Sequence, residues 1–530
     1  MEIHGKQIIG HASSVDGPAE DQAVNPTTGE RLLPLFHRAT EGEVHKAVSL
    51  AGDAFEELRA MVPGSRAAFL VKIAEEIEGI GADLIERCHR ESGLPVSRLE
   101  SEVGRTVGQL RMFAELVRDG GWVDARIDPA MPEREPLPRA DIRRMLIPIG
   151  PVVVFSASNF PLAFSTAGVD PASALAAGNP VIVKGHHAHP GTAELVGRAV
   201  QAAAKKTGMP PGIFSLLHGP GREVGMALVT HPGVRAVGFT GSQAGGRALF
   251  DAAASRPVPI PVYAEMASIN PVFILPSALA KKSERLVSIL HQSVTMGVGQ
   301  FCTNPGVLVL RQSPEARNLV DKLARLLADT PAAVMLHPGI RAAYGKGLAR
   351  LEKTVNVKLV GRGEGDAGPG KCHASGALFE TTAKSFLADD TMKEEVFGPC
   401  ILAVLCSSAD EMREVAGSFE GELTASVHGK EEELLDSADL VAILETRVGR
   451  LVFNGVPTGV EVCPAMNHGG PYPATTDVHF TSVGTAAIYR FARPVCYQNC
   501  PDRRLPDELK NANPLGIWRT VNGRLSREAL

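Results

Sequence analysis

Two reactive side chains, one thiol and one carboxylate, stand where they could act together on a carbonyl group. Cys302 lies in the polar stretch Gly299–Asn304 between two apolar segments, and Glu265 ends a strand-like run earlier in the chain. A thiolate can attack a carbonyl carbon, and a carboxylate can activate the water that later releases the covalent adduct. A lone cysteine is more often a small buried apolar residue, so the surrounding motifs must decide between the two interpretations.

An asparagine is the third candidate catalytic residue. Asn159 follows the β-branched run Val152–Phe155, and its side-chain amide could donate to a developing oxyanion beside the backbone N–H of Cys302. The alternative is a turn asparagine that caps the next helix.

Residues at the ends of two other predicted strands could contact a phosphate-bearing cofactor. Lys184 ends the run that begins at Val181, at the edge where parallel sheets present ligand contacts; a solvated loop lysine is the alternative. Phe239–Ser242 follows a strand and opens a helix, with Gly241 in the turn and Gly246 on the first helical turn. Free backbone amides there could receive a pyrophosphate, although such a turn is often only structural.

Two weaker motifs lie nearby. Gly219–Gly225, which contains Arg222, resembles the dinucleotide-binding fingerprint but has one extra residue before its last glycine. Three histidines fall within Gly185–His189, but they have no carboxylate or cysteine partner at ligand spacing. The sequence therefore predicts no metal site.

The size and composition indicate a folded protein of several domains. The chain has 530 residues, and a typical size of about 100 to 200 residues per domain suggests two to four domains. It is 44% hydrophobic and 21% charged, as globular proteins are. The net charge of -5 comes without a basic stripe, so we expect no nucleic acid partner.

The cysteines and the hydrophobic runs bear on the compartment. Eight cysteines without a C-x-x-C pair argue against disulfides or structural zinc and favour a reducing compartment. The first residues lack a signal-peptide pattern, and no run reaches the roughly 18 apolar residues that would span a membrane. We therefore expect a cytoplasmic protein without membrane contact.

Hydrophobic periodicity predicts mostly helices in about the first 120 residues and alternating strands and helices after them. A capping box at Thr40–Glu43 begins one helix, and a second helical pattern runs from about Arg66 to Leu84. From Pro151 the chain alternates between short β-branched runs and Ala-rich helical segments, and a second such region runs from near Asn270 to about Leu451. The predicted strands of the first region are Val152–Phe155, Val181–Val183, Ile213–Leu217 and Ala236–Phe239.

This alternation predicts an α/β fold with two Rossmann-like domains, each a parallel sheet covered by helices. Two further segments, Arg139–Pro148 and Ala486–Val495, alternate polar and apolar residues. They could form a β arm that pairs across subunits, or an edge strand within one domain.

Together these residues resemble the aldehyde dehydrogenase superfamily over nearly the whole chain. The landmarks occur in the family's order: Asn159–Pro161, Lys184, Phe239–Ser242, Glu265, Cys302 and Glu394–Pro399. The resemblance implies a cofactor-binding domain over 1–127 and 149–263, a catalytic domain over 264–478, and an oligomerisation arm with a C-terminal extension over 128–148 and 479–530. It also implies a homodimer or homotetramer.

By that resemblance Cys302 is the nucleophile, Asn159 an oxyanion donor and Glu265 the base for hydrolysis. Glu395 and Phe397 would position the nicotinamide ribose and ring, while Lys184 and Ser242 contact the cofactor. The implied reaction joins the thiolate to an aldehyde, transfers hydride to the nicotinamide, and uses water to release the acid. Because a free thiol has a pKa near 8.5, we expect the site or cofactor to lower it.

Two departures from the family pattern matter. Glu265–Pro271 reads Glu-Met-Ala-Ser-Ile-Asn-Pro in place of Glu-Leu-Gly-Gly-Lys-Ser-Pro, which leaves the resting position of Glu265 open. His187 stands where the family commonly has a glutamate that binds the ribose hydroxyls. A histidine would not repel a 2′-phosphate, and Lys184 or Arg222 could pair with it, so NADP is favoured over NAD.

The C-terminal part resembles a subgroup that oxidises 2,5-dioxopentanoate or, with NADP, fatty aldehydes. The resemblance rests on Asn467–Thr476, the run Cys496–Cys500 and the residues after it. The resemblance implies that the small-molecule aldehyde 2,5-dioxopentanoate is oxidised to 2-oxoglutarate. There are three alternatives. The substrate could be a fatty aldehyde, which would need a long apolar tunnel. The protein could be a CoA-acylating relative, although such enzymes tend to lack the glutamate base, or a non-enzymatic binding protein.

Overall fold

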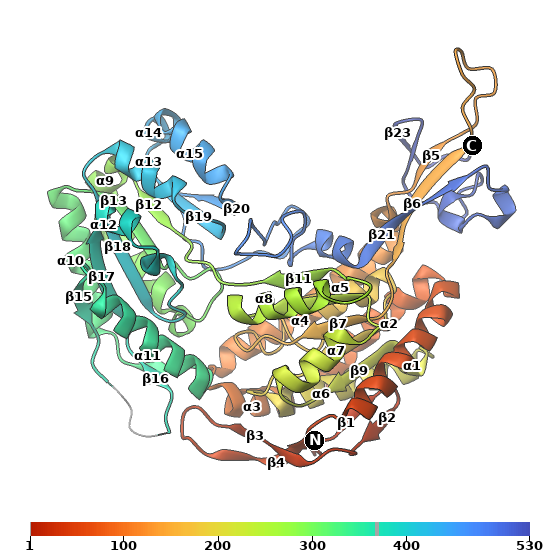
Figure 1. Ribbon diagram of the computed structural model, residues 1–530, viewed down its shortest axis with the longest axis horizontal. Coiled ribbons are helices and arrows are strands. Elements are labelled where there is room, and N and C mark those ends of the chain that lie inside the picture. The colour runs from red at the N-terminus through yellow and green to blue at the C-terminus, as the bar shows by residue number, and fades with distance from the viewer. Residues whose placement is uncertain (1, 366–369) are drawn as a thin grey trace.

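The protein folds into two α/β lobes, with a narrow β arm that projects from one of them (Figure 1). A computed structural model describes residues 2–365 and 370–530, with side chains described outside 280–283. In these described parts no helix is both long and apolar enough to cross a bilayer.

The first lobe is built on a seven-stranded sheet in the order β11-β10-β7-β8-β9-β1-β2. Strands β11 to β9 in that order are parallel, and β1 and β2 add an antiparallel edge. The strands predicted after Pro151 are confirmed within one residue at their ends. The bounds are β1 Gln7–Ile9, β2 Ala12–Ser14, β7 Val152–Phe155, β8 Val181–Lys184, β9 Phe214–Leu217, β10 Ala236–Thr240 and β11 Val262–Glu265.

Eight helices belong to this lobe. Thr40 and Glu43 make the predicted capping box of the first helix, which is confirmed. The predicted pattern from Arg66 to Leu84 is wrong as a single helix: it breaks at Ile80, whose two neighbours are glycines with low helix propensity. The bounds are α1 Glu41–Ala60, α2 Pro63–Gly79, α3 Gly81–Ser92, α4 Val96–Asp119, α5 Val169–Ala177, α6 Pro190–Lys206, α7 Met226–Thr230 and α8 Gln243–Ala254.

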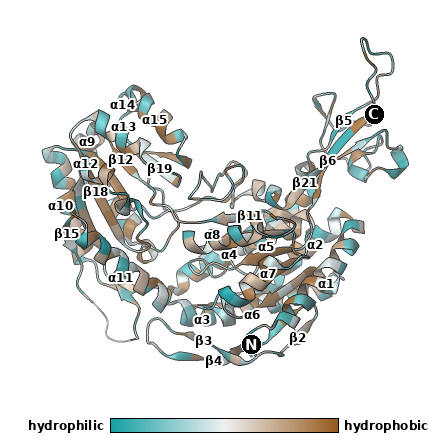
Figure 2. Cartoon of the chain, viewed as in Figure 1, coloured by the Kyte–Doolittle hydropathy of each residue, from teal (hydrophilic) through white to brown (hydrophobic). Residues whose placement is uncertain are grey.

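The second lobe has its own seven-stranded sheet, in the order β15-β17-β18-β13-β12-β19-β20. All neighbours are parallel except β15 and β17. The inner strand β18 is buried over its whole length and hydrophobic, whereas the outlying helix α14 is hydrophilic (Figure 2). The strands are β12 Val272–Ile274, β13 Val307–Arg311, β15 Lys358–Arg362, β17 Ala377–Thr382, β18 Cys400–Cys406, β19 Glu422–His428 and β20 Val448–Phe453.

The remaining elements of the second lobe are helices on both faces of this sheet and small accessory ladders. The helices are α9 Pro276–Thr295, α10 Pro314–Asp329, α11 Pro338–Lys353, α12 Ala383–Ala388, α13 Ala409–Gly417, α14 Glu431–Asp436 and α15 Ala438–Glu445. β14 Ala333–Val334 pairs with β16 His373–Ala374, and β3 Ala19–Val24 pairs with β4 Arg31–His37 in a hairpin on the first lobe that the sequence did not predict.

The arm is a five-stranded sheet in the order β21-β6-β5-β22-β23. The two predicted arm segments pair with each other inside one chain, because β6 runs antiparallel to β21. The second segment was placed too early: Thr485–Phe491 forms a 3-10 helix, and the strand follows it. The strands are β5 Arg126–Asp128, β6 Ile142–Pro148, β21 Ala492–Gln498, β22 Arg519–Val521 and β23 Arg524–Ser526.

Candidate active site

Cys302, Glu265 and a histidine, His468, meet where the two lobes face each other. Nε2 of His468 lies 3.3 Å from Sγ of Cys302 and 3.0 Å from Oε1 of Glu265. Cys302 is half-buried, whereas Glu265 and His468 are 3% and 1% exposed. A single imidazole nitrogen is therefore placed between a thiol and a carboxylate, away from bulk water.

The position of Glu265 follows from the strand that carries it. Glu265 is the last residue of β11, and parallel strands present their carboxyl ends at one edge of the sheet. There the Ser482 hydroxyl donates to Oε2 of Glu265 at 2.5 Å. The resting position that the sequence left open is thus inward, held by Ser482 and directed at His468.

The residues that depart from the family pattern after Glu265 hold the loop of the nucleophile. Nδ2 of Asn270 donates to the carbonyl oxygens of Cys302, at 2.8 Å, and Asn304, at 3.0 Å. Asn270 itself has a left-handed φ of 45°, which asparagine tolerates better than most residues. The buried Glu422 carboxylate fixes the turn by accepting the Ile269 N–H at 2.7 Å.

A glycine lets this loop approach the segment that contains Glu395 and Phe397. Gly299 has a φ of 63°, and a Cβ there would lie 2.3 Å from the carbonyl carbon of Gly398. Glu395 and Phe397 line a small cavity of about 20 Å³ next to Gly299. Burial raises the pKa of Glu395 to about 8.

The pKa values of the Glu265 carboxyl and the Cys302 thiol are shifted in opposite directions. Burial raises the pKa of Glu265, but the charge of His468 and the hydrogen bonds from His468 and Ser482 outweigh it and leave that pKa below its ordinary value. Burial, and next the charge of Glu265, hold the pKa of the Cys302 thiol well above its usual range. The expectation that the site lowers the thiol pKa is wrong for the protein alone, so the thiol needs a base at the moment of attack.

His468 is placed to be that base. In the neutral tautomer that carries its proton on Nδ1, the Nε2 lone pair of His468 is within hydrogen-bonding reach of Sγ, and it can accept the thiol proton and return it later. Because the same nitrogen faces Glu265, an imidazolium formed by this transfer would be stabilised by the carboxylate. The arrangement can generate a thiolate without requiring a low thiol pKa.

Asn159 lies close to this group but its amide is engaged. Nδ2 of Asn159 donates to the carbonyl oxygen of Gln300 at 3.2 Å, and Arg98 donates to the Asn159 carbonyl oxygen at 2.7 Å. The next helix, α5, has Gly168 at its N-cap. The helix-capping alternative for Asn159 is therefore wrong. Its side-chain amide is bound to Gln300, which precedes Cys302 by two positions in the chain.

Two of the predicted cofactor residues stand at the same sheet edge as Glu265. Lys184 ends β8 and is 6% exposed, which excludes the solvated-lysine alternative; burial lowers its pKa to about 8. Ser242 caps α8, and its Oγ accepts the Gly245 N–H at 3.2 Å, while Gly241 is exposed. A buried ammonium and an open helix N-terminus fit the phosphates of a dinucleotide.

The other predicted cofactor residues have less contact with this edge. Gly246 is buried against Met266, where a Cβ would lie 2.6 Å from the sulfur. Arg222 is exposed on the π-helical turn Gly221–Gly225, and His187 is exposed on the loop after β8.

The class defined by this geometry is an enzyme that combines a dinucleotide-binding sheet edge with covalent catalysis by cysteine. Residues 15–471 match the aldehyde dehydrogenase family, and the chain belongs to that family. It oxidises an aldehyde to an acid, and its family uses a nicotinamide dinucleotide, which supplies a hydride acceptor when bound.

Similar proteins support this over the full length. The chain is 52% identical to alpha-ketoglutaric semialdehyde dehydrogenase 2 of Azospirillum brasilense, across 99% of this chain and 100% of that protein. It is 43% identical to the alpha-ketoglutaric semialdehyde dehydrogenase of Acinetobacter baylyi, across 99% of both. The NAD+ complex of an aldehyde dehydrogenase from Bacillus cereus shares the fold, with a TM-score of 0.79 at 21% identity over 94% of this chain and 96% of that one.

Sequence reasoning missed His468 and Ser482 as functional residues. The stretch Asn467–Thr476 served only to mark a subgroup, and nothing in its spacing connects it to Cys302. The signal that could have found His468 is a histidine beside two glycines in a chain that already had a thiol and a carboxylate candidate.

Replacing His468 by Gln should slow thiolate formation at neutral pH, because the amide cannot take the thiol proton. We expect alkylation of Cys302 by iodoacetamide to fall by about 100-fold, in the range of general-base effects, and to recover as the pH rises toward the thiol pKa. A pH profile of the alkylation rate measures this. His479→Gln, at a side chain that is 80% exposed, is the control, and an unchanged profile in the His468 variant would rule out the role.

Replacing Glu265 by Gln should separate acylation from hydrolysis. We expect one equivalent of reduced cofactor to form per site, followed by turnover that is slower by about 100- to 10,000-fold, since the amide cannot deprotonate water. Rapid-mixing absorbance and mass spectrometry of the Cys302 thioester measure the two steps. If steady-state turnover matched the wild type, water activation would have to come from another group.

Proposed function

We propose that the protein oxidises 2,5-dioxopentanoate to 2-oxoglutarate with NADP. The two full-length relatives named above act, by their names, on this semialdehyde. The observation that carries the substrate assignment is a guanidinium near Cys302 with two buried nitrogens that have no hydrogen-bond partner in the part of the chain that the structure describes. Such a substrate brings its own carboxylate, which could pair with them.

That guanidinium belongs to Arg105 on α4. Its Nε and Nη2 are buried and have no hydrogen-bond partner within the described residues. Burial lowers the pKa of Arg105, and the first charge that opposes this effect is that of Cys302. The guanidinium carbon also lies 5.5 Å from the centre of the Phe160 ring and 5.4 Å from that of Phe164, so the two aromatic faces hold the charged head in place.

An unpaired buried guanidinium is costly, and a substrate carboxylate would satisfy it through two parallel N–H···O bonds. A fatty aldehyde has no group that could do this, so it would leave Arg105 unpaired. Glu265, directed at the site, supports hydrolysis of the thioester and disfavours the CoA-acylating alternative.

The steps follow from the geometry of the residues. His468 takes the Cys302 proton, the sulfur bonds to the aldehyde carbon, and the resulting oxyanion is met by the Cys302 N–H and the amide of Asn159. A nicotinamide cofactor held beside Lys184 and Ser242 would accept the aldehyde hydrogen as hydride, which would leave a thioester on Cys302. Glu265 then takes a proton from water, the hydroxide adds to the thioester, and the carbon–sulfur bond breaks.

The preference for NADP rests on charge. The ribose end of the cofactor would reach His187 and the Lys184 ammonium, and the family's glutamate is replaced there by an uncharged ring. A carboxylate at that position would repel a 2′-phosphate, whereas a lysine attracts it. Arg222, exposed on its turn, is free to approach from solvent.

We further propose that the arm joins copies of the chain into a homodimer or homotetramer and that the enzyme works in the cytoplasm. The arm sheet ends in β21 and β23, whose outer backbone groups could pair with another copy. All eight cysteines are free thiols, which suits a reducing compartment.

Turnover assays test the substrate and cofactor together. With 2,5-dioxopentanoate we expect kcat/KM with NADP to exceed that with NAD by about 10-fold or more, since each 1.4 kcal/mol of added charge pairing is a factor of ten. A medium-chain aldehyde is the competing substrate and Cys302→Ala the blank. Fast turnover of the medium-chain aldehyde alone would keep the mechanism and overturn the substrate.

Replacing Arg105 by Met should raise KM for 2,5-dioxopentanoate by about 10- to 100-fold, the value of a charged hydrogen-bonded pair. It should leave the KM of an uncharged aldehyde nearly unchanged, and Arg105→Lys should restore part of the loss. Arg111→Met, on the exposed face of the same helix where it pairs with Glu78, is the matched control. An equal loss for both substrates would mean that Arg105 only supports the fold.

A further inference from the structure

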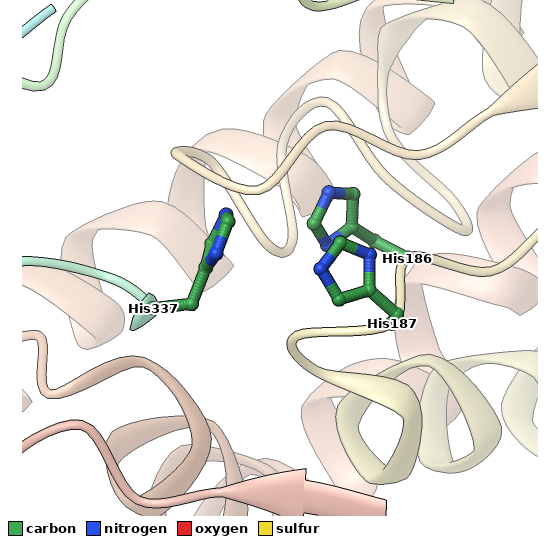
Figure 3. Close-up of side chains that lie close together, drawn as sticks. All are labelled: His186, His187 and His337. Atoms are coloured by element: carbon green, nitrogen blue, oxygen red, sulfur yellow. The ribbon is translucent and has the colours of Figure 1, made fainter. Parts of the chain in front are cut away.

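Three histidines from both lobes converge at the carboxyl end of β8. His186 and His187 lie on the loop between β8 and α6, and His337 precedes α11 in the second lobe. Figure 3 shows the His337 ring standing opposite the other two rings. One ring nitrogen of each histidine lies within 4.8 Å of the other two, and the centre of the His187 ring is 5.2 Å from that of His337.

Backbone hydrogen bonds determine what two of these rings can offer. The Ala188 N–H donates to Nδ1 of His186, and the Gly339 N–H donates to Nδ1 of His337, each at 3.1 Å. In a neutral imidazole whose Nδ1 accepts a hydrogen bond, the proton is on Nε2. Both rings therefore present N–H donors, whereas a metal ion would need lone pairs.

The charges around the rings also favour an anion. Partial shielding from water by the neighbouring rings, and next the charge of Lys184, lower the pKa of the surface-exposed His187, and burial lowers that of His337 to about 3, so both rings are uncharged at neutral pH. The Lys184 ammonium is buried, and it donates to the Gly185 carbonyl oxygen at 2.8 Å. Asp21, whose charge is felt at both Lys184 and His187, is already paired with Arg38 at 2.7 Å.

Two helices begin at this cluster. His189 is the N-cap of α6, and His337 is the N-cap of α11. Helix N-termini carry partial positive charge and favour anions. His189 is 1% exposed, its Nδ1 has no hydrogen-bond partner within the described residues, and its ring stacks on His186 at 5.3 Å between centres. Nε2 of His189 donates to the Ala157 carbonyl oxygen at 2.8 Å, so the free Nδ1 of the neutral ring is an acceptor and adds no donor for an anion.

We propose that His186, His187 and His337, with the Lys184 ammonium, form a receptor for a phosphate monoester dianion that is complete only when both lobes contribute. The occupant rests on the cofactor assignment made above, which identifies it as the 2′-phosphate of NADP. His337 then acts as a specificity-determining residue supplied by the catalytic lobe, and binding of the phosphate holds the two lobes together at the cofactor.

Equilibrium binding of 2′-AMP and 5′-AMP tests the receptor without catalysis, because the two differ only in the position of the phosphate. We expect the wild type to bind 2′-AMP about 10-fold or more tightly than 5′-AMP, an effect within the range for charge-assisted hydrogen bonds, and inorganic phosphate to compete with 2′-AMP. His337→Ser should abolish the preference while the affinity for 5′-AMP stays unchanged. Serine is chosen because it still caps α11.

Two further variants and one metal make the result decisive. His479→Ser, at an exposed ring elsewhere, should keep the 2′-AMP preference, and His187→Glu should reverse it through repulsion. A full preference in a folded His337→Ser protein, judged by its melting temperature, would overturn the role of the second lobe. Stoichiometric Zn²⁺ binding that is lost in His337→Ser, without any phosphate effect, would replace the anion receptor by a metal site.

The outcomes also separate this inference from the proposed function. If the enzyme turns over 2,5-dioxopentanoate but does not prefer 2′-AMP, the phosphate receptor is rejected and the substrate assignment stands. A 2′-AMP preference that depends on His337, in an enzyme inactive toward 2,5-dioxopentanoate, would keep the receptor and remove the substrate.

Discussion

A carboxylate buried beside a thiol is the constraint on which the site depends. Glu265 is 3% exposed, and an ionised carboxylate away from water is strongly unfavourable unless it is paired and hydrogen-bonded. The Ser482 hydroxyl supplies the hydrogen bond, and the His468 imidazole supplies the opposite charge when it is protonated. The same imidazole then faces the sulfur, so the group that stabilises the base also serves the nucleophile.

This arrangement requires both lobes at once. Glu265 comes from the last strand of the first sheet, while Cys302 stands before the strand β13 of the second sheet. The turn after Glu265 closes the distance, because Asn270 donates to the Cys302 carbonyl oxygen and Glu422 holds the backbone of that turn. The residues that depart from the family sequence here are therefore part of the support for the nucleophile.

The histidine cluster repeats the same design at the other end of the cofactor site. His187 belongs to the first lobe and His337 to the second, and neither makes the receptor alone. A cofactor that touches both would favour the alignment in which Cys302, His468 and Glu265 are also together, so cofactor binding and catalytic geometry depend on one interface.

The sequence by itself determined the local structure and indicated the candidate pair of Cys302 and Glu265. Short β-branched runs before glycine-rich turns identified β7, β8 and β10, and the resemblance carried Cys302, Glu265 and Asn159 in order. Those features are local, because strand propensity, capping and motif spacing are written within a few residues. The resemblance implied a carboxylate-bearing substrate, but nothing in the sequence pointed to Arg105 as the group proposed to receive it.

The tertiary structure alone decided which distant side chains meet. His468 reaches Cys302 from 166 positions away along the chain, and Arg105, on a helix of the first lobe, is close enough to Cys302 for their charges to interact. The sequence showed no ligand partner for the histidines of Gly185–His189, but the fold brings His337 of the second lobe next to His186 and His187. No periodicity records such contacts, because they are fixed by how two sheets pack against each other, and that packing also set the high pKa of the thiol.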